Sequence, residues 1–151
     1  KELHICGPNT EEAFFKHYNP LIKNSSNIKY HGFIPPGGPH FDVLAGHCSY
    51  MVYHSAAEGC CTAVTTTMHA GLVPLVNEWS GIKIDDGKNG HILSDEGDLI
   101  ENITQAVDRA AGVEQGEYEK IVSNVLRKKS LFTQKSYIES YSRALQAVLE
   151  D

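Results

Sequence analysis

The chain has 151 residues, of which 41% are hydrophobic and 21% charged, and its formal net charge is −6. This length and composition suit one soluble globular domain, and the acidic charge argues against a nucleic-acid partner. No apolar run reaches the roughly 18 residues of a membrane span, so we expect no transmembrane segment, although peripheral membrane association of the full protein stays compatible with the sequence. Cys6, Cys48, Cys60 and Cys61 lack CxxC spacing, and we expect reduced thiols in a cytoplasmic protein.

Apolar runs of strand length alternate with helical patterns along the chain. Thr10 is a suitable N-cap for the first helix, and Gly71 is a suitable C-cap for the third. In chain order we expect strand 3–6, helix 10–24, strand 27–31, helix 41–45, strand 50–53, helix 59–70, strand 73–76, strand 90–93 and helices 95–111, 114–129 and 133–150. In the last two helices, the apolar positions at helical spacing are expected core residues: Tyr118, Ile121, Val125, Tyr137, Tyr141, Leu145 and Val148.

This order of elements predicts an α/β fold. We expect a Rossmann-like, mostly parallel sheet with helices on both faces and a final run of helices. Ligands of such sheets bind beyond the carboxyl ends of the strands. The loops after Cys6, His31, Tyr53 and Val76 are therefore the expected ligand region.

The segment from Glu58 to Ala63 follows the third strand and is expected to begin a helix at Gly59. A helix N-terminus offers unpaired backbone N–H groups and a partial positive charge, which suit phosphate, and glycine allows a ligand to approach the backbone. Glu58 can accept hydrogen bonds from hydroxyls. Together these features suit a sugar nucleotide, which carries both phosphate and hydroxyl groups. On local chemistry alone, Glu58 acting only as a helix cap is the simpler alternative.

Other features point less clearly to a ligand. Gly7 and Gly32 end strands at the expected ligand edge, where most glycines simply form turns. The eight histidines lack the close ligand pairs of zinc sites, so we expect no metal. Walker A, G-x-G-x-x-G and G-x-S-x-G motifs are absent. Trp79, after the fourth strand, is expected either to line a pocket or to plug this end of the domain.

The order of these motifs resembles the C-terminal, donor-binding domain of group 1 (family 4) retaining glycosyltransferases of the GT-B fold. The resemblance covers about residues 3–149, and its most specific parts are Glu58-Gly59, Ala70-Gly71-Leu72-Val73-Pro74, and the segment from Asp86-Gly87 to Leu93. It implies a transferase that moves a sugar from a nucleotide-diphosphate sugar to an acceptor in surface polysaccharide or glycan synthesis. It implies no metal and no other cofactor.

The resemblance also implies roles for single residues. Glu58 matches the first glutamate of the family's E-G-F-G motif and is the expected catalytic residue, orienting the donor and stabilising developing charge. Gly32, Phe33 and Ile34 match a loop beside the nucleotide base. The other expected donor-binding residues are Gly7, Ser55, Gly59, Cys60 and Cys61 (the two cysteines through amides on sugar hydroxyls), Thr62 and Ala63 (through amides on the diphosphate) and Thr66.

Two departures from the family pattern matter. Thr66 occupies the position of the family's second glutamate, which binds the nucleotide ribose, so ribose binding is expected to differ. The family's first strand of this domain, its diphosphate-binding Arg and Lys, and the N-terminal acceptor domain would all precede Lys1. We therefore expect residues 1–151 to be a single donor-binding domain of a longer enzyme, inactive by itself. The alternatives are a non-catalytic module that binds a sugar or a partner, and another GT-B enzyme such as a sugar-nucleotide epimerase.

Overall fold

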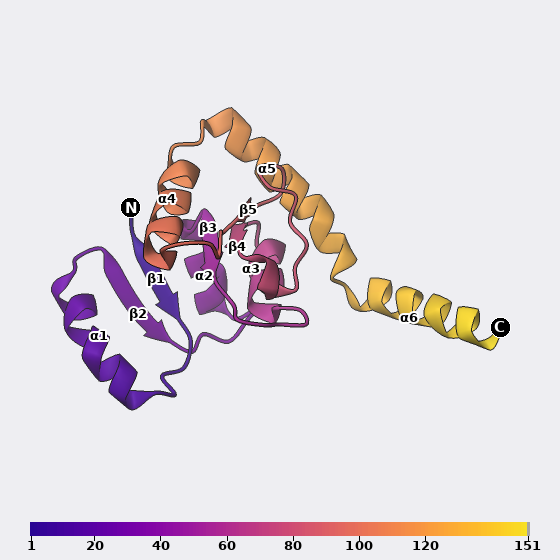
Figure 1. Ribbon diagram of the computed structural model, residues 1–151, viewed down its shortest axis with the longest axis horizontal. Coiled ribbons are helices and arrows are strands. Elements are labelled where there is room, and N and C mark those ends of the chain that lie inside the picture. The colour runs from indigo at the N-terminus through magenta and orange to yellow at the C-terminus, as the bar shows by residue number, and fades with distance from the viewer. Residues whose placement is uncertain (151) are drawn as a thin grey trace. The chain divides into compact units, whose positions relative to one another are not determined.

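The computed structural model describes residues 1–150 of the chain. They divide into two compact units, residues 1–44 and the residues from Ala45 onward, and each is described by itself (Figure 1). In both units the strands are parallel and helices accompany them. The expected α/β fold class with a final run of helices is therefore confirmed.

The first unit contains a two-stranded parallel sheet. Strand β1 (Leu3–Cys6) pairs with β2 (Ile28–Gly32), and helix α1 (Glu12–Asn24) connects them. The ring of Phe15 on α1 lies 4.8 Å from that of Tyr30 on β2, between ring centroids. The predicted cap at Thr10 is wrong: Glu11 is the N-cap residue and makes no side-chain cap bond, so the Thr10 hydroxyl lies one residue too early to cap.

The second unit contains a three-stranded parallel sheet in the order β3 (Tyr50–Tyr53), β4 (Val73–Val76), β5 (His91–Ile92). Helix α2 (Pro39–His47), whose residues fall in both units, precedes β3, and α3 (Thr62–His69) connects β3 to β4. After β4 come the 3-10 turn η1 (Glu78–Ser80) and, beyond β5, α4 (Leu99–Ala111), α5 (Gln115–Lys128), the 3-10 turn η2 (Lys129–Leu131) and α6 (Gln134–Leu149).

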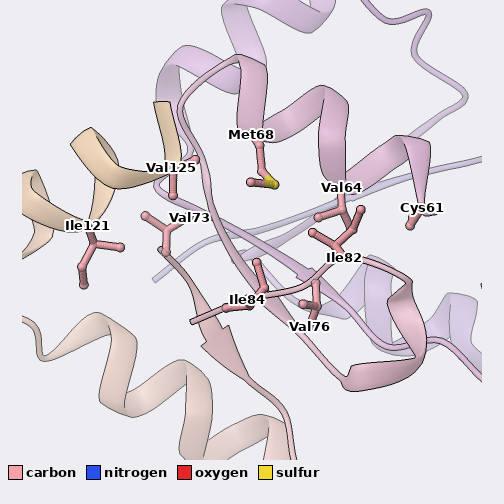
Figure 2. Packing of buried hydrophobic residues seen from close by; sticks show 9 residues of the cluster. All are labelled: Cys61, Val64, Met68, Val73, Val76, Ile82, Ile84, Ile121 and Val125. Atoms are coloured by element: carbon pink, nitrogen blue, oxygen red, sulfur yellow. The ribbon is translucent and has the colours of Figure 1, made fainter. Parts of the chain in front are cut away.

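The central strand β4 is buried along its whole length because side chains pack on both of its faces. Val73 and Val76 belong to a buried hydrophobic cluster that Figure 2 shows. Its other members come from α3, α5 and the adjoining loops: Cys61, Val64, Met68, Ile82, Ile84, Ile121 and Val125. Leu75 joins a second cluster with Leu93 and two alanines of α4. Helices therefore cover both sides of this sheet, which explains the uniformly apolar sequence of β4.

Helices α3 and α4 begin later than the sequence predicts, because a capping side chain or a bond to a distant loop fixes the residues before them. Helix α3 begins at Thr62 rather than Gly59, so Glu58 and Gly59 lie in the loop before it. Helix α4 begins at Leu99 rather than 95, because Asp98 accepts a hydrogen bond from the Glu101 amide and acts as the N-cap. At the end of α3, Gly71 has a φ of 91° and its amide donates to Met68 O, which confirms the predicted glycine stop.

Of the core positions predicted for the last two helices, those of α5 are buried or packed on the core and those of α6 are exposed. Ile121 and Val125 of α5 are buried and Tyr118 packs against them, as predicted. The same prediction for α6 is wrong: Tyr137, Tyr141, Leu145 and Val148 are all exposed, and no residue of α6 is buried. The apolar stripe of α6 has the helical period, but the described residues provide no element that covers it.

Candidate functional site

The candidate site is built around the loop between β3 and α3, residues 54–61, which we call the Glu58 loop. It lies on the loop after β4, and three backbone positions hold it there. The Glu58 amide donates to Trp79 O at 2.8 Å, and the Cys61 amide donates to Ser80 O at 3.1 Å. Ser55 exchanges two hydrogen bonds with the Asn77 side chain, from Ser55 N to Asn77 Oδ1 (3.0 Å) and from Asn77 Nδ2 to Ser55 O (2.8 Å).

The Asn77 side chain is itself fixed by ionisable neighbours. It is 1% exposed, and its Nδ2 donates to Asp95 Oδ1 at 3.0 Å. The same Asp95 oxygen lies 2.6 Å from His54 Nε2. The hydrogen bond from Asn77, and then the one from His54, lower the pKa of Asp95 below its usual range. His54, Asn77 and Asp95 thus join the carboxyl ends of β3 and β4 to the segment that follows β5.

The sequence prediction missed these three residues. Their only sequence signal is position, because His54 and Asn77 each directly follow an apolar strand. Asp95 is separated from Asn77 by 18 residues, and only the parallel pairing of β4 with β5 brings the two together.

The Glu58 side chain is exposed, and one of its oxygens is held. Tyr53, the last residue of β3, donates its hydroxyl to Glu58 Oε1 at 2.9 Å. This hydrogen bond to the Glu58 carboxylate raises the pKa of the Tyr53 hydroxyl, which therefore stays protonated and remains a donor. In the described part of the chain, Glu58 Oε2 has no hydrogen-bond partner.

The first turn of α3 follows directly after the loop. It carries no acidic side chain, and its N-cap residue Cys61 makes no side-chain cap bond. In residues 1–150 the Thr62 and Ala63 amides have no hydrogen-bond partner, so they are free to meet an anion. The Cys61 amide is already donated to Ser80 O, so of the two cysteine amides expected to face sugar hydroxyls only that of Cys60 is unpaired in the described chain.

Thr66 lies one turn further along α3 and is half-buried. The hydroxyls of its neighbours bond back to the helix, Thr65 to Thr62 O at 3.1 Å and Thr67 to Val64 O at 2.9 Å. In the described residues the Thr66 hydroxyl has no such partner. It lies at helical spacing from Thr62 and Ala63, so it shares their side of the helix.

The other predicted donor-binding residues belong to the unit 1–44. The Gly7 amide donates to Gly32 O at 2.8 Å, so the structure brings these two strand-ending glycines together. Phe33 is exposed, whereas Ile34 is buried. The predicted residues thus form two groups, one in each compact unit.

Trp79 does not plug the end of the sheet, because it is 52% exposed. Its backbone, rather than its ring, holds the Glu58 loop.

Within residues 1–150, no group of three or more His, Cys, Asp and Glu side chains is arranged to hold a metal ion. Across the same residues, no helix combines the length and the apolar character needed to cross a membrane.

No protein-family model matches the sequence, and no curated protein matches it. The fold, however, matches solved glycosyltransferases. The pneumococcal O-GlcNAc transferase GtfA, solved with UDP and GlcNAc, matches this chain with a TM-score of 0.71 and 15% sequence identity. The match covers 99% of this chain and 30% of GtfA. WaaG, a glycosyltransferase of lipopolysaccharide biosynthesis, matches 85% of this chain over 34% of its own length, with a TM-score of 0.65 and 14% identity.

A third match is AviGT4, a glycosyltransferase of avilamycin A biosynthesis, with a TM-score of 0.59 and 16% identity, covering 97% of this chain and 44% of that protein. The chain therefore spans less than half the length of each of these enzymes. At such identities the likeness establishes the fold, which is that of part of a GT-B glycosyltransferase.

Proposed function

We propose that this chain is the donor-binding part of a retaining, family 4-type glycosyltransferase. The complete enzyme would transfer a sugar from a nucleotide-diphosphate sugar to an acceptor during glycan or surface polysaccharide synthesis in the cytoplasm. An N-terminal acceptor domain of the same protein would complete the active site. In this proposal no metal takes part, and the chain by itself has no transferase turnover.

One observation carries the proposal. The Glu58 carboxylate lies in the loop that leads into α3, with Oε1 held by the Tyr53 hydroxyl and Oε2 without a hydrogen-bond partner in the described chain. The unpaired Thr62 and Ala63 amides follow at once. An acceptor for sugar hydroxyls therefore stands next to donors for phosphate, which is the pairing that a nucleotide-diphosphate sugar requires. Glu58 would orient the donor sugar and stabilise the charge that develops as the leaving group departs.

The test is an NMR titration of the isotope-labelled chain with UDP, UDP-GlcNAc and a panel of other UDP- and GDP-sugars. We expect at least one nucleotide sugar to shift the Thr62 and Ala63 amide signals in a saturable way. Glu58→Ala should weaken that binding about tenfold, in keeping with loss of a hydrogen bond to a charged group. Glu119→Ala, which removes an exposed carboxylate on α5, serves as the matched control and should change nothing.

If no nucleotide or nucleotide sugar shifts these signals, the proposal fails. Saturable binding of free oligosaccharides instead would support a non-catalytic glycan-binding module. A sugar-nucleotide epimerase is distinguished by its product, because the complete protein would then convert the donor sugar without any acceptor.

A further inference from the structure

The Glu58 carboxylate is oriented by one side chain. Among the described residues its single side-chain hydrogen bond comes from the Tyr53 hydroxyl, at 2.9 Å from Oε1. The backbone beneath it is held separately, by the bond from the Glu58 amide to Trp79 O. The position of the loop and the direction of the carboxylate therefore depend on different groups.

Tyr53 is well placed to keep this direction. As the last residue of β3 it is paired with Val76 of β4, and its ring packs partly buried against the cluster that contains Cys61 and Val64. A phenol ring has few rotatable bonds, so a packed ring fixes the position of its hydroxyl closely. Glu58, by contrast, is an exposed side chain that would otherwise sample several rotamers.

We propose that Tyr53 is a positioning residue that holds Glu58 Oε1 so that Oε2 accepts a hydrogen bond from one hydroxyl of the donor sugar. This inference rests on the proposed function and adds to it a specificity determinant outside the E-G motif. With one carboxylate oxygen occupied by a phenol donor, the other presents a single acceptor in a defined direction. Such a site binds more tightly a sugar that has a hydroxyl at the matching position, and it does not change the affinity for the nucleotide part of the donor.

The experiment compares binding of UDP with binding of UDP-sugars or, if the wild-type chain prefers it, GDP with GDP-sugars. The measured quantity is the sugar-dependent gain, the ratio of the dissociation constant of the nucleoside diphosphate to that of the nucleotide sugar. Tyr53→Phe keeps the packed ring and removes the hydroxyl. We expect this gain to fall about fivefold, within the usual range for one intramolecular hydrogen bond. The dissociation constant of the nucleoside diphosphate should stay within about twofold of the wild-type value.

Tyr118→Phe is the matched control. Its hydroxyl donates to Ser49 O at 3.3 Å, so the variant loses a comparable hydrogen bond away from the Glu58 loop. It should leave both dissociation constants unchanged. In a Glu58→Ala background, Tyr53→Phe should cause no further loss of the sugar-dependent gain, because the two residues act as one unit.

The outcomes separate the two proposals. A wild-type chain that binds no nucleotide sugar overturns the proposed function and this inference with it. Normal wild-type binding with an unchanged gain in Tyr53→Phe overturns the inference alone. The same holds if Tyr53→Phe weakens the nucleoside diphosphate and the nucleotide sugar equally, or if its effect adds to that of Glu58→Ala, since either result indicates a merely structural role.

Discussion

Gly81 lies directly against the Glu58 carbonyl: a Cβ atom on Gly81 would stand 2.7 Å from Glu58 O. Gly81 also has a φ of 70°, in the left-handed region that favours glycine. The loop that carries the candidate catalytic residue therefore rests on a glycine that the loop after β4 supplies. This contact makes the position of the Glu58 backbone dependent on a residue more than twenty positions away in the sequence.

Gly81→Ala should lower the free energy of unfolding by about 3 kcal/mol, combining the left-handed penalty with the cost of overpacking. Gly87→Ala is the control, because Gly87 also has a φ of 70° but a Cβ there meets nothing within 4 Å. That variant should lose only about 1 kcal/mol. Urea denaturation measures both values, and equal losses in the two variants would contradict the contact. Nucleotide-sugar binding should be lost in Gly81→Ala alone.

Asn77→Ala should destabilise the chain by about 3 kcal/mol, because it leaves the Ser55 amide and carbonyl unpaired in a buried position. Asn77→Asp should also destabilise it, since a carboxylate cannot donate to Ser55 O and would repel Asp95. Urea denaturation again provides the measurement, with the exposed Asn9→Ala as control. Unfolding free energies within about 0.5 kcal/mol of wild type would show that the Ser55 bonds are replaced, for example by water.

Thr66→Glu tests the departure from the family motif. The Thr66 hydroxyl has no partner in the described chain, and a glutamate there would offer the ribose a two-oxygen acceptor. We expect about tenfold tighter binding of the nucleoside diphosphate by calorimetry or NMR, a gain appropriate to a charged hydrogen bond. Thr65→Glu is the control, because Thr65 is half-buried on the same helix but its hydroxyl bonds to Thr62 O. Unchanged or weaker binding in Thr66→Glu would contradict ribose contact at this position.

Stability of the β1–β2 unit should fall as the pH falls. His31 on β2 lies 2.9 Å from His4 on β1, between His31 Nε2 and His4 Nδ1, and its ring contacts that of His40. Burial lowers the pKa of His31, and the charges of His4, His40 and Lys29 lower it further, against an opposing effect of Glu2. The unfolded chain therefore binds a proton more readily, so stability is full above the unfolded pKa of about 6.5 and declines below it.

Hydrogen exchange of the β1 and β2 amides, corrected for intrinsic rates, should report this decline between about pH 7.5 and about pH 5.5. His31→Gln should flatten the pH dependence of protection. His17→Gln, an exposed substitution on α1, should leave it as in the wild type. A slope that survives in His31→Gln would assign the effect to another group.

Much of the fold could be predicted from short stretches of sequence. The strands 3–6, 50–53 and 73–76 have the bounds that the structure gives them, because each is an apolar run of strand length bounded by turn-forming or polar residues. Gly71 was predictable as the end of α3 because only the local backbone conformation matters there. The Glu58-Gly59 motif likewise identified the loop that the structure places at the carboxyl end of β3.

The tertiary structure decided how that loop is held. The start of α3 at Thr62, the Asn77 and Asp95 bonds and the contact with Gly81 all depend on groups that meet only once β3, β4 and β5 are paired. The exposure of the apolar stripe of α6 could not be predicted from the sequence either, because a helical period indicates which side chains share a face and not whether another element covers that face. Local interactions let the sequence alone predict most of the elements, whereas the geometry of the site was decided by contacts between residues far apart in the chain.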